Sequence, residues 1–172
     1  SNSASGNYAL YSNTTGYSNS ASGMQALYAN TTGSSNSALG YQALAANTTG
    51  SSNSASGNYA LFANTTGDYN TALGYQAGDF ITTGSNNVII GYGSDPSAVD
   101  ASNKIVIGKG ATGQADNSVT LGNADVTAIY MAQDSGATVY AAGLNIGGTA
   151  VTSTAAELNI LDGVTATATE LN

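Results

Sequence analysis

The chain has 172 residues, only 7% of them charged, and a net charge of −8 from ten acidic residues and two lysines. An ordinary globular domain is about 25% charged, and two bases cannot neutralise a row of phosphates, so nucleic acid and anionic membrane surfaces are disfavoured as partners. Histidine and cysteine are absent, which removes the commonest general base, the commonest metal ligand and any disulfide. No stretch approaches the length of an apolar membrane span, so we expect no membrane insertion.

A regular sequence repeat occupies residues 1–84. Glycine recurs with one constant spacing in two series, at positions 6, 23, 40, 57, 74, 91 and 108 and at positions 16, 33, 50, 67 and 84. The consensus is SNSA(L/S)G(Y/N)(Q/Y)ALxANTTGS. Such self-similarity is typical of solenoids, in which each unit stacks on its own copy. Glycine at these intervals excludes long helices, so we predict two short strands per unit, SNSALG and YQALAA, joined by two turns.

Stacking places equivalent residues on neighbouring coils about 4.7–4.9 Å apart. We therefore expect ladders of alanine (Ala4, Ala21, Ala38, Ala55, Ala72), leucine (Leu10, Leu27, Leu44, Leu61) and asparagine (Asn13, Asn30, Asn47, Asn64). Like charges would repel on every coil, which explains their scarcity. One leucine and a few alanines per unit bury little area against the conformational entropy of the chain. We therefore expect other copies of the chain to supply the missing apolar contacts.

Residues 85–128 continue the repeat in a degenerate and more apolar form, with NNVIIG at 86–91, NKIVIG at 103–108 and NSVTLG at 117–122. Their β-branched residues predict strands. Residues 129–149 are interpreted as a β transition segment. Residues 150–172 carry a shorter repeat, TAAELN at 154–159 and TATELN at 167–172, whose Thr-x-x-Glu pattern resembles a capping box and predicts short helical turns.

Several of these phrases resemble sequences of known fibre proteins. NNVIIG, NKIVIG and NSVTLG are similar to the N-S-V-A-I-G signature of trimeric autotransporter adhesin heads, which are left-handed parallel β-rolls built as homotrimers. NTTGSSNSALGYQAL and TAAELNILDGVTATATELN resemble repeats of bacteriophage tail fibres. The resemblance implies an all-β solenoid or parallel β-roll in an intertwined homotrimeric fibre, attached to a virion, with adhesion as its purpose.

We therefore expect a structural segment of a phage tail fibre that spaces and presents host-receptor adhesion. Its expected partners are other copies of the chain, in a trimer and end to end, and a cell-surface glycan. The alternatives are a bacterial surface adhesin or self-assembling extracellular fibril, and an ice- or carbohydrate-binding module. Each places the chain outside the cell, on a virion or on the cell surface. Because no nucleophile elbow, phosphate-binding loop or paired carboxylates are found, we expect neither an enzyme nor a cofactor or metal site.

Three sets of residues are candidates for binding or modification. The Asn-Thr-Thr motifs match the N-x-S/T glycan acceptor, although asparagine and threonine are equally typical of turns; the acceptors would be Asn13, Asn30, Asn47 and Asn64. Aromatic residues near the glycines and leucines would contact either receptor sugars or a neighbouring chain: Tyr8, Tyr11, Tyr28, Tyr41, Tyr59 and Tyr75. The repeated threonine pairs would form either an ice-binding array or a solvated turn ladder.

Overall fold

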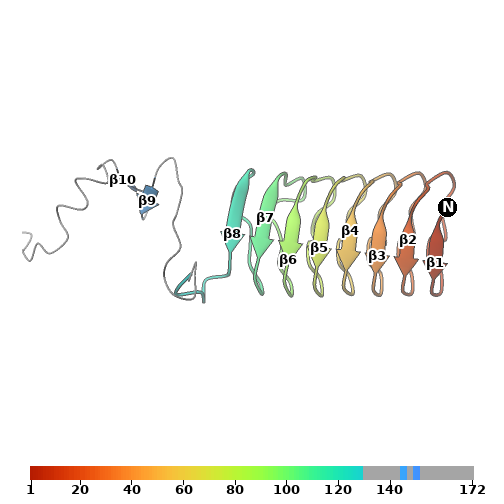
Figure 1. The fold of residues 1–172 in the computed structure, drawn as a ribbon, viewed down its shortest axis with the longest axis horizontal. Helices are drawn as coiled ribbons and strands as arrows, with labels where there is room; N and C mark the ends of the chain where they lie inside the picture. The colour runs from red at the N-terminus through yellow and green to blue at the C-terminus, as the bar shows by residue number, and fades with distance from the viewer. Residues whose placement is uncertain (130–143, 147–148, 152–172) are drawn as a thin grey trace, which may run out of the picture. The chain divides into compact units, whose positions relative to one another are not determined.

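The computed structural model describes residues 1–129, 144–146 and 149–151. The chain divides into two units, Ser1–Ala128 and Ile129–Asn172. The first unit is one sheet of eight parallel strands in chain order (Figure 1). The strands are β1 (Ser3–Ser5), β2 (Ser20–Ser22), β3 (Ser37–Leu39), β4 (Ser54–Ser56), β5 (Thr71–Leu73), β6 (Val88–Ile90), β7 (Lys104–Ile107) and β8 (Ser118–Leu121).

The second unit contains β9 (Leu144–Ile146), which pairs antiparallel with β10 (Thr149–Val151). The helical turns expected near the C-terminus begin at Thr154, outside the described residues. In the residues that the structure describes, no helix is long and apolar enough to cross a membrane.

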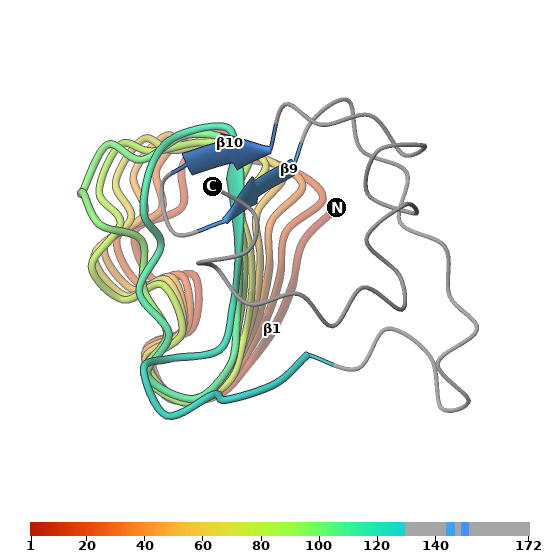
Figure 2. The ribbon, with the colours of Figure 1, turned by 90° about the vertical axis from the view of Figure 1, so that its left-hand side faces the viewer.

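Each coil of the first unit contributes one strand to the sheet. Ala21 pairs with Ala38, its equivalent in the next sequence repeat, and the same step is kept from β1 to β7. Only the last step is shorter, with Lys104 opposite Ser118. Seen along the axis, successive coils nearly superimpose (Figure 2). The all-β solenoid and the register predicted from the repeat are confirmed.

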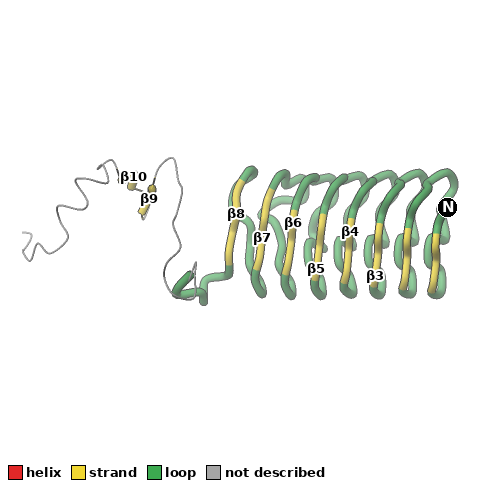
Figure 3. Tube along the Cα trace, in the orientation of Figure 1, coloured by secondary structure: helices red, strands yellow, loops and turns green. Residues whose placement is uncertain are grey.

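The second strand that we predicted in each unit is wrong: the YQALAA segments are turns (Figure 3). Gln42 and Leu44 have φ values of 54° and 53°, in the left-handed region that ends an extended path. Ala43, Leu44 and Ala45 are all buried, whereas a strand would alternate its side chains between two faces. The turn is bonded to its neighbour instead, because the Leu44 amide donates to the Ala60 carbonyl at 3.0 Å.

The core is a stack of small side chains inside the coil. The alanine ladder is buried from Ala21 to Ala72 and continues as Ile89 and Val106. A second row joins the predicted leucine ladder to Ala26, Ala43, Ala60 and Ala77; Leu27, Leu44 and Leu61 are fully buried, and Leu10 on the first coil is partly buried. Both ladders are therefore confirmed.

The leucine ladder changes after Leu61. The next equivalent position is Gly78, while Ile81 stands where the preceding coils have an asparagine. Ile81 is fully buried. A Cβ atom added to Gly78 would lie 3.2 Å from Leu61 Cδ2 and 3.5 Å from Ile81 Cδ1. Ile81 therefore fills the space that a leucine occupies in the earlier coils.

The two glycine rows allow the coils to approach closely. Gly40 has a φ of +136°, and a Cβ atom there would lie 2.5 Å from the carbonyl oxygen of Gly57. A Cβ atom on Gly50 would overlap Asn47 Oδ1 and lie 2.5 Å from the Gly67 carbonyl oxygen. Contact with the next coil, as well as backbone conformation, thus requires glycine.

A second row of asparagines, at positions 19, 36, 53, 70 and 87, ties each strand to its neighbours. The Asn36 backbone amide donates to Asn19 Oδ1 at 2.9 Å, and Asn36 Nδ2 donates to the Gly50 carbonyl at 2.8 Å. The row ends at Lys104, which is 2% exposed. Its ammonium group donates to Ser97 Oγ at 2.8 Å and lies 3.5 Å from Asp116 Oδ1, which satisfies the buried charge.

Candidate functional site

The Asn-Thr-Thr asparagines form a hydrogen-bonded ladder at the turn. Asn47 Nδ2 donates to Asn30 Oδ1 at 2.8 Å and to the Gly50 carbonyl at 2.9 Å, and Asn30 and Asn64 repeat both bonds. These three side chains are fully buried, whereas Asn13 is half-buried. The amide ladder predicted from the sequence is confirmed. In the folded chain the Nδ2 atoms of Asn30, Asn47 and Asn64 are buried and already donate hydrogen bonds.

The threonine pairs have divided roles. The first threonine donates its hydroxyl to the next coil, as Thr31 Oγ1 does to the Thr48 carbonyl at 3.0 Å. The same bond is made from Thr14, Thr48 and Thr65. The second threonines, at positions 15, 32, 49, 66 and 83, are exposed. The second threonines therefore form one exposed row, because the first threonines are hydrogen-bonded to the next coil.

The candidate aromatic residues gather in two clusters on the YQALAA turns. In the first, Tyr11 and Tyr28 stack on consecutive coils, with ring centroids 5.4 Å apart and planes within 5°, and Tyr8 contacts both edge to face. In the second, Tyr59 contacts Tyr41, Tyr75 and Phe62 edge to face. The sequence prediction named six tyrosines, and the structure brings them together three by three. The Tyr41 hydroxyl beside it raises the pKa of Tyr59.

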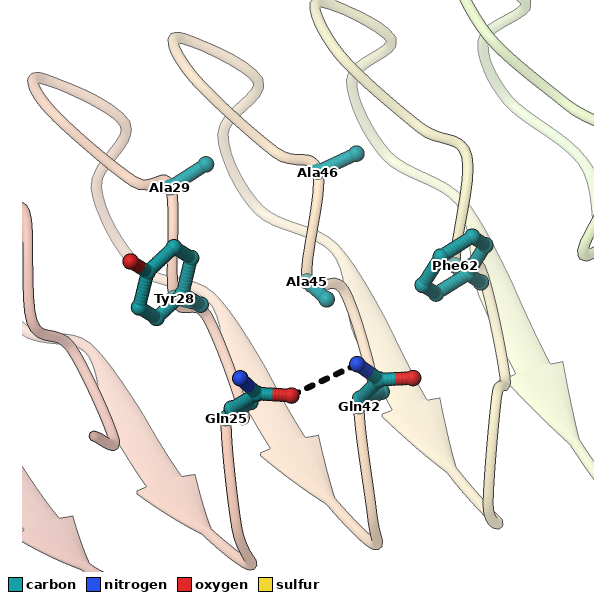
Figure 4. A pocket seen from close by; sticks show the side chains of 7 residues that line it. All are labelled: Gln25, Tyr28, Ala29, Gln42, Ala45, Ala46 and Phe62. Atoms are coloured by element: carbon teal, nitrogen blue, oxygen red, sulfur yellow. Dashed lines mark hydrogen bonds between the residues drawn. The ribbon is translucent and has the colours of Figure 1, made fainter. Parts of the chain in front are cut away.

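A hollow of about 340 Å³ separates the two clusters (Figure 4). Its position follows from one residue: Ala45 stands where the preceding coil has Tyr28 and the following coil has Phe62. The lining residues are Gln25, Tyr28, Ala29, Gln42, Ala45, Ala46 and Phe62. The two glutamines meet at the rim, where Gln42 Nε2 donates to Gln25 Oε1 at 2.6 Å.

The glutamines and Ala45 were missed by the sequence prediction. The available signal was a departure from the repeat: position 45 is alanine, whereas positions 11, 28 and 62 of the same phase are aromatic. A departure of this kind does not distinguish a hollow from a position where something else fills the space, so the neighbouring side chains had to be placed first.

The outward side of the sheet changes chemistry along the coil axis. On β1, β2 and β4 both outward residues are serine. From β5 onward the outward side chains are mainly large and apolar, and several are well exposed: Leu73 51%, Ile105 38%, Ile107 38%, Val119 60% and Leu121 44%. Val88 and Ile90 between them are half-buried. We call this set, from Leu73 to Leu121, the outer apolar face.

Charged groups are sparse, and two of the acidic ones, Asp79 and Asp95, are neighbours beside the loop that contains Pro96. Burial raises the pKa of Asp95 to about 7; the neighbouring carboxylate of Asp79 acts in the same direction, while the hydrogen bond from the Phe80 amide lowers it. In the part of the chain that the structure describes, no three histidine, cysteine or acidic residues gather to hold a metal ion.

The candidate regions are therefore two surfaces of different chemistry, the outer apolar face and the hollow between the aromatic clusters. Neither contains a group with the geometry of a nucleophile and its base. Comparisons with known protein families, with curated proteins and with solved structures find no match to this chain.

Proposed function

We propose that the chain is a structural segment of a homotrimeric fibre, and that the copies meet through the outer apolar face. The observation that carries this proposal is the exposure of large apolar side chains on a regular sheet, such as Val119 and Leu73. Soluble monomers rarely leave such a contiguous surface in water, and it commonly marks an interface with another protein. The small alanine-rich core supports the same proposal, because a single coil buries little apolar area of its own.

The proposed task of the fibre is to space and present contacts with a host receptor. Its likeness to phage tail-fibre phrases supports a place on a virion, outside the cell. A rigid rod with three parallel copies presents each weak binding site three times, and this raises the overall avidity without new chemistry at any site. A stack in which every coil is hydrogen-bonded to the next supplies that rigidity.

The test is the mass of the full chain in solution, measured by light scattering over a range of concentrations. We expect a trimer. Ile107→Asp places a carboxylate in the outer apolar face and should dissociate the trimer, whereas Ser22→Asp changes the same outward row at its polar end and should leave it intact. Circular dichroism of each variant reports whether the sheet is retained. A wild-type chain that is monomeric at all concentrations would refute the proposal, and a trimeric Ile107→Asp variant would place the interface elsewhere.

A further inference from the structure

We propose that the hollow over Ala45 binds one neutral hexopyranose ring between Tyr28 and Phe62. This inference rests on the adhesive part of the proposed function and names its class of ligand. It depends on a single chain, however, because all the lining residues come from neighbouring coils of the same solenoid.

The width of the hollow matches one six-membered ring. Tyr28 and Phe62 lie two coils apart, which corresponds to about 9.5 Å along the axis. Where aromatic residues occupy consecutive coils, as Tyr11 and Tyr28 do, their centroids are 5.4 Å apart. Ring centroids in favourable contacts are about 4.5–7 Å apart. A ring placed over Ala45 therefore lies within stacking distance of both Tyr28 and Phe62.

The floor and walls suit the C–H face of a sugar. Ala29, Ala45 and Ala46 contribute methyl groups to the lining, so a ring can lie against them without displacing a polar group. The rings of Tyr28 and Phe62 border the hollow, and the electron-rich face of an aromatic ring attracts the weakly positive C–H groups of a pyranose. Binding sites for small ligands typically combine such an apolar lining with a few polar groups that fix orientation.

The glutamine pair supplies those polar groups. Gln42 Nε2 already donates to Gln25 Oε1, and this bond holds both amides at the rim. Figure 4 shows the Gln42 oxygen directed to the Phe62 side and the Gln25 nitrogen to the Tyr28 side. Neither the Oε1 atom of Gln42 nor the Nε2 atom of Gln25 has a hydrogen-bond partner among the described residues. Together they present one acceptor and one donor, which sugar hydroxyls, being both donors and acceptors, can satisfy.

The charge of the chain selects a neutral sugar. No residue that lines the hollow is charged, and the only two bases of the chain, Lys104 and Lys109, belong to later coils. With a net charge of −8, the chain would repel a sialic acid or a sugar phosphate. A purely apolar ring would stack equally well but would make no hydrogen bonds to the glutamine amides, and so would lack the polar contacts that fix a ligand's orientation.

The experiment is saturation-transfer NMR on the full chain with methyl glycosides of glucose, galactose, mannose and N-acetylglucosamine. We expect at least one of them to receive saturation at its ring C–H protons. Ala45→Tyr inserts the missing ring and should abolish the transfer. This variant should fold, because it repeats the stacking that Tyr11 and Tyr28 already show. Phe62→Leu should weaken binding about tenfold, whereas Phe62→Tyr should preserve it.

Three results would overturn the proposal. The first is that the wild type binds none of the four glycosides. The second is that Ala45→Tyr binds as well as the wild type, which would place the sugar elsewhere. The third is that Ala45→Tyr lowers the mass of the assembly while the wild type binds no sugar. The hollow would then be a contact between chains. The mass of the wild type is measured in the same samples. A trimer without sugar binding would therefore refute this inference alone and leave the proposed fibre intact.

Discussion

The exchange at Gly78 and Ile81 offers the sharpest test of how the coils are held together. In the preceding coils the leucine and asparagine occur as a pair, Leu44 with Asn47 and Leu61 with Asn64. Because Ile81 cannot donate, the Oδ1 atom of Asn64 is buried without a hydrogen-bond partner. The combined change Gly78→Leu and Ile81→Asn would restore the repeat and give Asn64 the donor that it lacks.

Each single change should destabilise the protein. Ile81→Asn gains a hydrogen bond to Asn64, worth about 1–3 kcal/mol because it relieves an unsatisfied buried oxygen. It also removes a fully buried isoleucine, at about 2–5 kcal/mol. Gly78→Leu alone crowds Leu61 and Ile81 and places a bulky residue at a φ of +64°, costing about 1–3 kcal/mol for each effect. In the double variant the new leucine fills the space left by Ile81, so we expect stability within about 1 kcal/mol of the wild type.

The assay is a double-mutant cycle from urea unfolding followed by circular dichroism. We expect a favourable coupling of at least about 2 kcal/mol between the two changes. Asn47→Ile serves as a control, because it interrupts the asparagine ladder beside a leucine that is still present. It should crowd Leu44 and destabilise the chain. Additive effects of the two single changes would refute the idea that Ile81 substitutes for a leucine. A stabilised Ile81→Asn single variant would do the same.

Three further predictions concern single positions. Gly50→Ala should destabilise the chain by more than about 3 kcal/mol, since its Cβ would overlap the side-chain oxygen of Asn47; Gly93→Ala, whose Cβ would meet nothing within 4 Å, should cost only about 1 kcal/mol in urea unfolding for its positive φ. Tyr69→Asn should increase the free energy of unfolding by about 0.5–1 kcal/mol and so raise the melting temperature, because Tyr69 is exposed at a φ of 58° and asparagine tolerates this conformation better. An unchanged or lower melting temperature would contradict this expectation. The free energy of unfolding should fall as the pH rises from about 4 to about 7, since the folded chain keeps a proton on Asp95 that the unfolded chain has released; Asp95→Asn should flatten this dependence, and an equal slope in both proteins would contradict it.

The stacking of the coils could be predicted because it depends only on the match between equivalent residues of successive repeats. An exact repeat places each alanine and each asparagine on its own copy, whatever path the chain takes between them. The path itself could not be predicted in the same way. A leucine in the left-handed conformation, such as Leu44, contradicts its intrinsic preference. It is held there by burial and by the hydrogen bond from its amide to the next coil, both of which exist only after stacking.

The candidate surfaces, like the path of the chain, could not be predicted from the repeat alone. Alternation in NKIVIG predicts that one side of the strand is buried, but not that Ile105 and Ile107 point outward while Val106 points inward. That choice follows from the direction in which the chain turns after the strand. The hollow was harder still to anticipate, because Ala45 looks like any other alanine of the repeat. Its meaning comes from the rings of Tyr28 and Phe62, which stand at the equivalent positions of the coil before it and the coil after it.

The contacts of each coil have a consequence for how such a rod changes in length. Nearly every hydrogen bond between coils joins residues 14 to 18 positions apart, so a coil in the regular part of the stack contacts only the coil before it and the coil after it. Duplicating or deleting one whole unit there would bring together two surfaces that already match, and would alter no other contact. A gain or loss of fewer residues would misalign both glycine rows at once. Length in this rod is therefore quantised, in steps of one coil or about 4.8 Å, and genetic recombination between identical units can change the reach of the rod without passing through a misfolded intermediate.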